Sequence, residues 1–116
     1  MVNIYDSANE LAANIQEIDE YKALSAALDD VKQNATSLAL FKEMDQIQSQ
    51  IMNAQAQGEE LSQELQDKYQ KLDEKVQKDA TIMKLLQAEQ GLYKIIDDVQ
   101  KTLTKPINDL YNDLRK

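Results

Sequence analysis

Residues 79–103 read DATIMKLLQAEQGLYKIIDDVQKTL. Apolar side chains recur in this stretch at steps of three and four, which places them along one side of an α-helix. Asp79 is a residue type that favours the position just before a helix. We therefore predict an amphipathic helix that begins next to Asp79. Its apolar stripe consists of Ile82, Leu85, Leu86, Leu92, Tyr93, Ile96, Val99 and Leu103.

The same spacing continues toward the N-terminus, with shifts in phase that mark helix boundaries. A first stripe runs over residues 4–18, with Asp6 or Ser7 as the expected cap of its first turn. A second stripe runs over residues 21–38, and the change of phase predicts a break near Asp19. Residues 34–37 favour caps and turns, so we predict another boundary there.

Two residues with unusual backbone preferences mark further boundaries. Gly58 follows a stripe over residues 40–58 and precedes Glu59 and Glu60, so it is expected in the turn of a helical hairpin. Those two acids would then lie at the positive end of the next helix, whose stripe begins at Leu61. Pro106 predicts that the helix stops and restarts, with a short amphipathic tail over residues 107–114.

The fold class follows from this pattern. No segment shows the alternation and β-branched enrichment typical of a strand, so the chain is predicted to be all-α. We expect one helical domain over residues 1–116, built as an antiparallel bundle of long amphipathic helices. Its apolar stripes are too long and narrow to fold onto one another within a single chain. We therefore predict that two copies of the chain associate.

Composition limits the classes of partner. The net charge of −8 repels nucleic-acid phosphates and anionic membrane surfaces, so neither is expected as a partner. The first half of the chain carries three lysines and nine acidic residues, which either attract a basic protein or form a solvated acidic face. There is no cysteine, no signal-peptide pattern and no apolar run long enough to cross a membrane, so a cytoplasmic location is expected.

Composition also argues against catalysis. Without histidine or cysteine, the usual ligands of zinc and the usual bases of nucleophilic catalysis are missing. Phosphate-binding loops need several closely spaced glycines, and the chain has only Gly58 and Gly91. We therefore predict a protein without enzymatic activity, without a metal and without a cofactor.

One acidic residue lies within an apolar stripe. Glu89 keeps the helical spacing with Leu86, Tyr93 and Ile96, which favours a position inside a helical interface. It is either a buried acid with a raised pKa or a residue at the stripe's margin that pairs with a lysine of another helix.

Residues 46–57 contain no charged side chain, which is unusual for an exposed helix. Protein interfaces are depleted in charged residues and enriched in methionine, so we predict a contact surface between chains here. The alternative is a helix buried within one chain. The candidate residues of this contact surface are Leu40, Met44, Ile47, Ile51, Met52 and Ala54.

Several short segments resemble the YheA branch of the YlbF/YmcA/YheA family of small helical proteins from Gram-positive bacteria. They are residues 3–11 (NIYDSANEL), 21–24 (YKAL), 55–58 (QAQG) and 85–89 (LLQAE), followed by Leu92, Tyr93 and Ile96. The resemblance implies an intertwined helical homodimer with no known catalytic residue. Family members in the other two branches carry cysteines associated with an iron–sulfur cluster, and this chain has none.

The leading hypothesis is a dimerising scaffold or regulator that acts through protein contacts. A second hypothesis is a secreted helical hairpin of the WXG100 type, because Tyr69 with Asp73 and Tyr93 with Asp97 match the Tyr-x-x-x-Asp export pattern of that family. The chain lacks the tryptophan of the Trp-x-Gly turn that gives the family its name. A third is an enzyme that needs no cofactor and uses Glu, Lys or Tyr.

Overall fold

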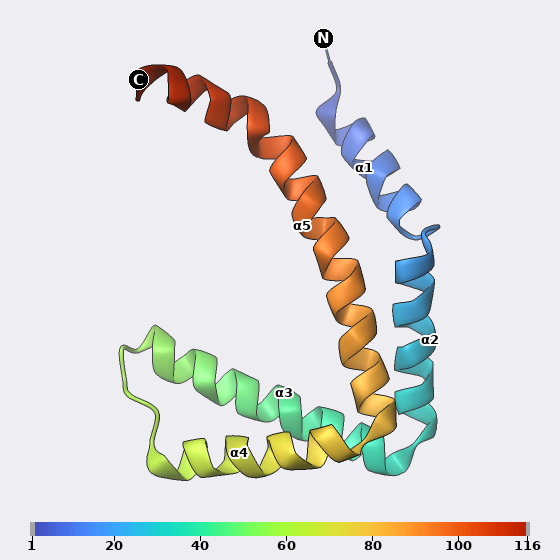
Figure 1. The fold of residues 1–116 in the computed structure, drawn as a ribbon, viewed down its shortest axis with the longest axis vertical. Coiled ribbons are helices and arrows are strands. Elements are labelled where there is room, and N and C mark those ends of the chain that lie inside the picture. The colour runs from blue at the N-terminus through green and yellow to red at the C-terminus, as the bar shows by residue number, and fades with distance from the viewer. Residues whose placement is uncertain (1, 116) are drawn as a thin grey trace. The chain divides into compact units, whose positions relative to one another are not determined.

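All the regular structure in the computed structural model, which describes residues 2–115, is helical (Figure 1). Within those residues there is no strand, so the all-α prediction is confirmed. The helices in chain order are α1 (Ile4–Ile15), α2 (Asp19–Gln33), α3 (Ala35–Ala56), α4 (Gln63–Lys78) and α5 (Ala80–Leu114).

Three predicted breaks are present, and short polar side chains cap the helices that begin at two of them. A turn over residues 16–18 separates α1 from α2, which begins at Asp19 as predicted. The side chain of Asn34 accepts hydrogen bonds from the backbone N–H groups of Thr36 and Ser37, both at 3.1 Å, and so starts α3. Asp79 accepts from the N–H of Ile82 at 2.9 Å and starts α5. The starts of α3 and α5 are therefore set by local chemistry that is visible in the sequence.

Gly58 makes the hairpin turn between α3 and α4. Its φ of +71° lies in the left-handed region, which favours glycine because a side chain there is strained. The N–H of Gly58 donates to the carbonyl of Gln55, and that of Glu59 to the carbonyl of Ala54. The two helices then run antiparallel and pack against each other, as predicted (Figure 1).

Two predicted helix starts were wrong by a few residues. The cap of α1 is Asn3 rather than Asp6 or Ser7, because its side chain accepts from the N–H groups of Tyr5 and Asp6. The cap of α4 is Ser62, which accepts from the N–H of Leu65 at 3.1 Å. The predicted acids 59 and 60 therefore lie in the connection before α4, and Glu64 is the acid of its first turn.

The prediction that the last helix stops at Pro106 was also wrong. Helix α5 continues through Pro106 to Leu114. A proline removes one backbone hydrogen bond and kinks a helix without having to end it. The hydroxyls of Thr102 and Thr104 donate to the carbonyls of Asp98 and Gln100, a pattern that also bends helices. The axis of α5 accordingly bends in its orange-to-red part (Figure 1).

The chain divides into two compact units. Unit 1 contains residues 1–24 and 87–116, and unit 2 contains residues 25–86. Within the described residues, every buried apolar residue except Leu92 belongs to unit 2. The core of unit 2 consists of Ala27, Val31, Leu40, Leu72, Val76, Ile82 and Leu85.

Unit 1 has much less buried surface. Its helices lie side by side at Gly91, where an added methyl group would lie 3.9 Å from Cγ of Glu20. No residue of α1 is buried. The predicted single domain over residues 1–116 stays a prediction, although α2 and α5 each run without interruption from one unit into the other.

Candidate protein contact surfaces

The candidate residues of the predicted contact surface on α3 differ in exposure, because α4 packs against one side of this helix. Leu40 is 7% exposed and belongs to the core of unit 2, whereas Met52 is 60% exposed. The remaining candidates are half-buried, because they lie on or beside the side of α3 that faces α4. Contact with another chain through this face stays a prediction. The half-buried candidates are Met44, Ile47, Ile51 and Ala54.

An apolar groove of about 370 Å³ runs along one side of the α3–α4 hairpin. Met44, Ile47 and Ile51 of α3 line it, and Gln48 and Asp73 add polar atoms to its walls. A second hollow shares two of its lining residues and extends toward the hairpin turn. The other residues that line the apolar groove are Tyr69, Leu72, Val76 and Leu86.

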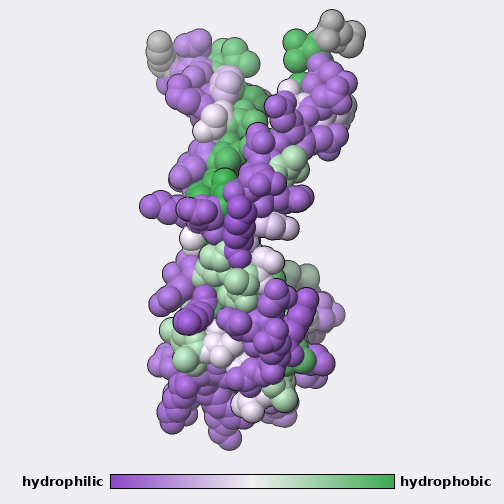
Figure 2. Space-filling view, turned by 90° about the vertical axis from the view of Figure 1, so that its right-hand side faces the viewer, coloured by the Kyte–Doolittle hydropathy of each residue, from purple (hydrophilic) through white to green (hydrophobic). Residues whose placement is uncertain are grey.

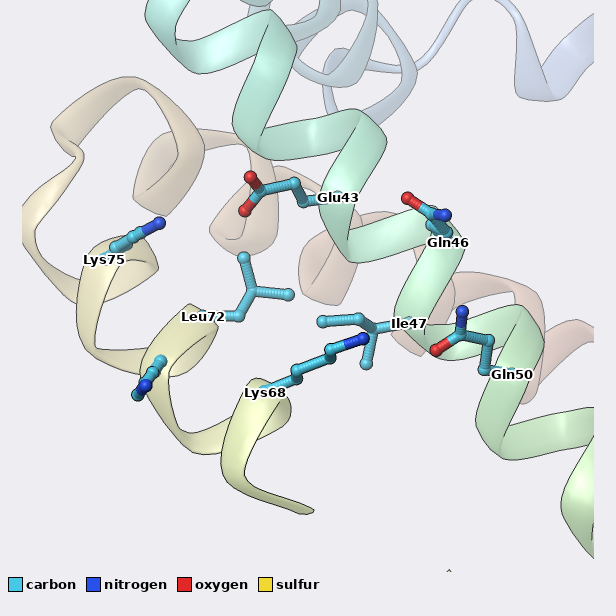
Figure 3. A pocket seen from close by; sticks show the side chains of 8 residues that line it. Glu43, Gln46, Ile47, Gln50, Lys68, Leu72 and Lys75 are labelled. Carbon is cyan, nitrogen blue, oxygen red and sulfur yellow. The ribbon is translucent and has the colours of Figure 1, made fainter. Parts of the chain in front are cut away.

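A different groove of about 310 Å³ lies between the same two helices (Figure 3). Ile47 and Leu72 point toward each other across it and line both grooves, so they form the seam of the hairpin. The walls of this groove are polar. They consist of Glu43, Gln46 and Gln50 on α3 and Lys68, Lys71 and Lys75 on α4.

The apolar stripe of α5 loses its cover toward the C-terminus. Ile82 is fully buried, but Leu103 is 63% exposed and Leu114 is 82% exposed. Every described residue from 100 onward is exposed. We call the exposed end of this stripe the terminal apolar face. It consists of Leu103, Ile107, Leu110 and Leu114, at steps of four, three and four.

The N-terminal segment of unit 1 is similarly uncovered. Val2, Ile4 and Tyr5 are all exposed. Figure 2 shows apolar surface in green that runs among hydrophilic side chains in the part formed by unit 1. Isolated exposed apolar residues are ordinary, but a continuous helical stripe with a buried end and an exposed end is typical of a contact surface.

Ser37 and Asp79 form a polar link in unit 2. Ser37 is fully buried, and its Oγ lies 3.0 and 2.8 Å from the two carboxylate oxygens of Asp79. The backbone N–H of Ile82 lowers the pKa of Asp79 from its ordinary value, burial opposes this shift, and the Ser37 hydroxyl lowers the pKa further. This pair has a structural role, because it joins the start of α3 to the start of α5.

Glu89 lies in unit 1 and is half-buried, next to the half-buried Ala88. Whether its carboxyl is a buried acid or a register-setting partner of a lysine stays a prediction. Within residues 2–115, no group of three or more His, Cys, Asp or Glu residues is arranged to hold a metal ion. In the same range, no helix is long and apolar enough to cross a membrane.

Two features of these surfaces were missed from the sequence. The lysines of the polar groove repeat at steps of three and four, which places them on one side of α4. The sequence also places acids four residues before Lys68 and Lys71, a spacing typical of ordinary helix-stabilising pairs, so the lysines alone do not indicate a binding surface. The exposure of the terminal apolar face had no signal, since a stripe looks the same whether it is buried or exposed.

Comparison with known proteins places these observations in a family. A family model described as "Control of competence regulator ComK, YlbF/YmcA" matches residues 4–108. A UPF0342 protein of Lactobacillus acidophilus is 53% identical over 116 residues, which cover 100% of both chains. A UPF0342 protein of Staphylococcus saprophyticus is 36% identical over 112 residues and covers 97% of this chain and 98% of its own.

A solved structure shows the same fold. It is described as "Protein of Unknown Function (DUF964) from Bacillus stearothermophilus" and has a TM-score of 0.83 at 23% identity. The match covers 93% of this chain and 95% of the other. Assignment to the YheA branch stays a prediction. The match over residues 4–108, together with these relatives, shows that the chain belongs to the YlbF/YmcA family.

Proposed function

We propose that this chain is a non-catalytic, dimerising protein that acts in the cytoplasm as a scaffold or regulator through protein contacts. The observation that carries the proposal is the exposed end of the α5 stripe. At its N-terminal end the stripe is core, with Ile82 and Leu85 fully buried. Four residues that continue it are more than half exposed.

A second copy of the chain is the partner that fits this face best. The terminal apolar face repeats at heptad-like steps of four, three and four, which suits packing against another helix. Each fully covered leucine or isoleucine contributes about 1.5–3 kcal/mol of favourable free energy relative to an exposed one. Covering four of them in each of two chains therefore offsets much of the free-energy cost of association. The exposed Ile4 and Tyr5 of α1 add to the surface that a second copy would cover.

The regulatory part of the proposal rests on the family. Its model is described by the control of a competence regulator, which points to a role in controlling a partner protein. The composition supports a role without catalysis, because histidine and cysteine are both absent. The family match gives no support to the WXG100 alternative.

The test compares two double variants by light scattering coupled to size-exclusion chromatography. Leu103→Glu with Leu110→Glu places two carboxylates on the terminal apolar face. The matched control, Asn108→Glu with Asn112→Glu, adds the same charge on the opposite side of α5. We expect the control and the unmodified protein to have twice the mass of one chain and the first variant to be a folded monomer.

The same variants test the regulatory role. Each is expressed in the native bacterium with an affinity tag, and the proteins that co-purify are identified by mass spectrometry. A partner retained by the control and lost by the monomeric variant supports a scaffold that needs two copies. A dimer that binds no other protein in the cell contradicts the proposed role. Turnover of a substrate by the pure protein without any protein partner also contradicts it.

A further inference from the structure

The polar groove between α3 and α4 carries a row of positive charge in an acidic protein. Lys68, Lys71 and Lys75 lie at steps of three and four on α4, and they span about 10 Å of its length. The chain as a whole has a net charge of −8. This lysine row is therefore a local reversal of sign, which is the arrangement that selects an anionic partner.

The charges of this row are only partly neutralised within the chain. Lys68 pairs with Glu64 at 3.3 Å, and both side chains are largely exposed, so solvent weakens the pair. Lys71 and Lys75 form no ion pair with any residue in the range 2–115. By contrast, the exposed Lys101 of α5 pairs with Asp97 at 2.9 Å. The lysine row thus keeps charge that a partner can use.

The opposite wall and the floor narrow the class of partner. Glu43 points into the groove from α3, toward the side on which Lys75 lies (Figure 3). Ile47 and Leu72 form an apolar floor between the two walls. A nucleic acid would set its phosphates against Glu43 and would leave the apolar floor without an apolar contact. A helix with both carboxylates and apolar side chains fits all three features.

We propose that this groove binds an acidic amphipathic helix of a partner protein. Apolar side chains of that helix pack on Ile47 and Leu72, and carboxylates at steps of three and four pair with the lysine row. Gln46 and Gln50 supply uncharged hydrogen-bonding groups along the other wall. The proposal rests on the proposed role in protein binding, but it uses a surface in unit 2 rather than the terminal apolar face.

The test uses a fluorescent synthetic helix with leucine on one side and glutamate beside it, and its binding is followed by anisotropy. A second peptide carries lysine in place of every glutamate, and a single-stranded RNA oligonucleotide is the third probe. The protein is compared with the variant Lys68→Glu, Lys71→Glu, Lys75→Glu. The matched control, Lys32→Glu, Lys101→Glu, Lys105→Glu, makes the same change in net charge.

We expect the acidic peptide to bind the unmodified protein and the control, and reversal of the lysine row to weaken binding about tenfold or more. Equal binding to the variant and the control overturns the proposal. Failure of the acidic peptide to bind, or tighter binding of the RNA or of the lysine peptide, also overturns it. A variant with glutamine at the same three positions repeats the comparison should charge reversal prevent folding.

Mass measurements on the same samples separate this proposal from the proposed function. The lysine variant is expected to keep the mass of the unmodified protein, because the row lies outside the terminal apolar face. A monomeric unmodified protein that still binds the acidic peptide contradicts the proposed dimer and leaves the groove proposal intact. A dimeric protein that does not bind the acidic peptide contradicts the groove proposal and leaves the proposed dimer intact.

Discussion

The hydroxyl oxygen of Ser37 lies 3.0 and 2.8 Å from the two carboxylate oxygens of Asp79, across 42 positions of sequence. One oxygen of the same carboxylate accepts the backbone N–H of Ile82 at 2.9 Å. A single side chain therefore both starts α5 and holds it against the first turn of α3.

Loss of either partner of this pair is expected to destabilise the fold. Ser37→Ala removes a hydrogen bond to a charged group, which is worth about 1.5–3 kcal/mol of unfolding free energy. Asp79→Ala removes the same bond together with the helix cap and leaves the buried Ser37 hydroxyl without its acceptor. Urea unfolding of the two variants and of the double variant measures the coupling. Effects that simply add would contradict the linkage.

Stability is expected to fall in acid through Asp79. Its pKa in the folded chain lies below the ordinary value of 3.8, chiefly because of the Ile82 N–H. The stabilisation is therefore complete above pH 3.8 and is lost as the pH falls through the lower folded value. Asp79→Asn keeps the cap but cannot change charge, so it should lose less stability than the unmodified protein between pH 7 and pH 3. An identical slope in Asp79→Asn and in the unmodified protein argues against this account.

The two glycines predict opposite effects of the same substitution. Gly58→Ala should destabilise by about 1 kcal/mol, because φ of +71° is strained for alanine although no atom lies within 4 Å of the added methyl group. Gly91→Ala should stabilise by up to about 1 kcal/mol, because it lies inside α5 and its nearest contact is an ordinary 3.9 Å. Thermal unfolding of both variants measures the difference. Stabilisation by Gly58→Ala would contradict the turn described here.

The buried Leu40 and the exposed Met52 of α3 predict different losses of stability on substitution. Leu40→Ala should destabilise by about 2–4 kcal/mol, because Leu40 is buried in the core of unit 2. Met52→Ala should change the unfolding free energy by less than about 0.5 kcal/mol, since most of its surface is exposed. Chemical unfolding at low protein concentration makes the comparison. Equal losses would mean that Met52 is covered, which the structure of one chain does not show.

Helix boundaries were predictable where one side chain decides them. Asp19, Asn34, Gly58 and Asp79 each have a strong local preference for a helix boundary or turn, and each marks a boundary in the structure. Pro106 was misleading. The free-energy cost of a proline inside a helix is local, and the helical residues on both sides of Pro106 oppose a break. The cap at Asn3 was missed because Asp6 and Ser7 are also favoured cap types, and the cap at Ser62 was missed because Glu59 and Glu60 were expected in the first turn of the helix.

The surfaces were less predictable than the helices. The uncharged residues 46–57 lie in or directly after α3, which packs on α4, but the absence of charge does not distinguish a partner within the chain from one in another chain. That distinction depends on what covers each side chain, as the contrast between Leu40 and Met52 shows. The lysine row needed the structure, because only the packing of α3 on α4 places Glu43 opposite it.

Sedimentation equilibrium of the pure, unmodified protein over a wide range of dilution tests the central claim most directly. In the proposed dimer a second chain covers the terminal apolar face, so the account predicts a mass of twice 13.2 kDa that persists to low concentration. A fully folded species with the mass of one chain at every concentration would contradict it.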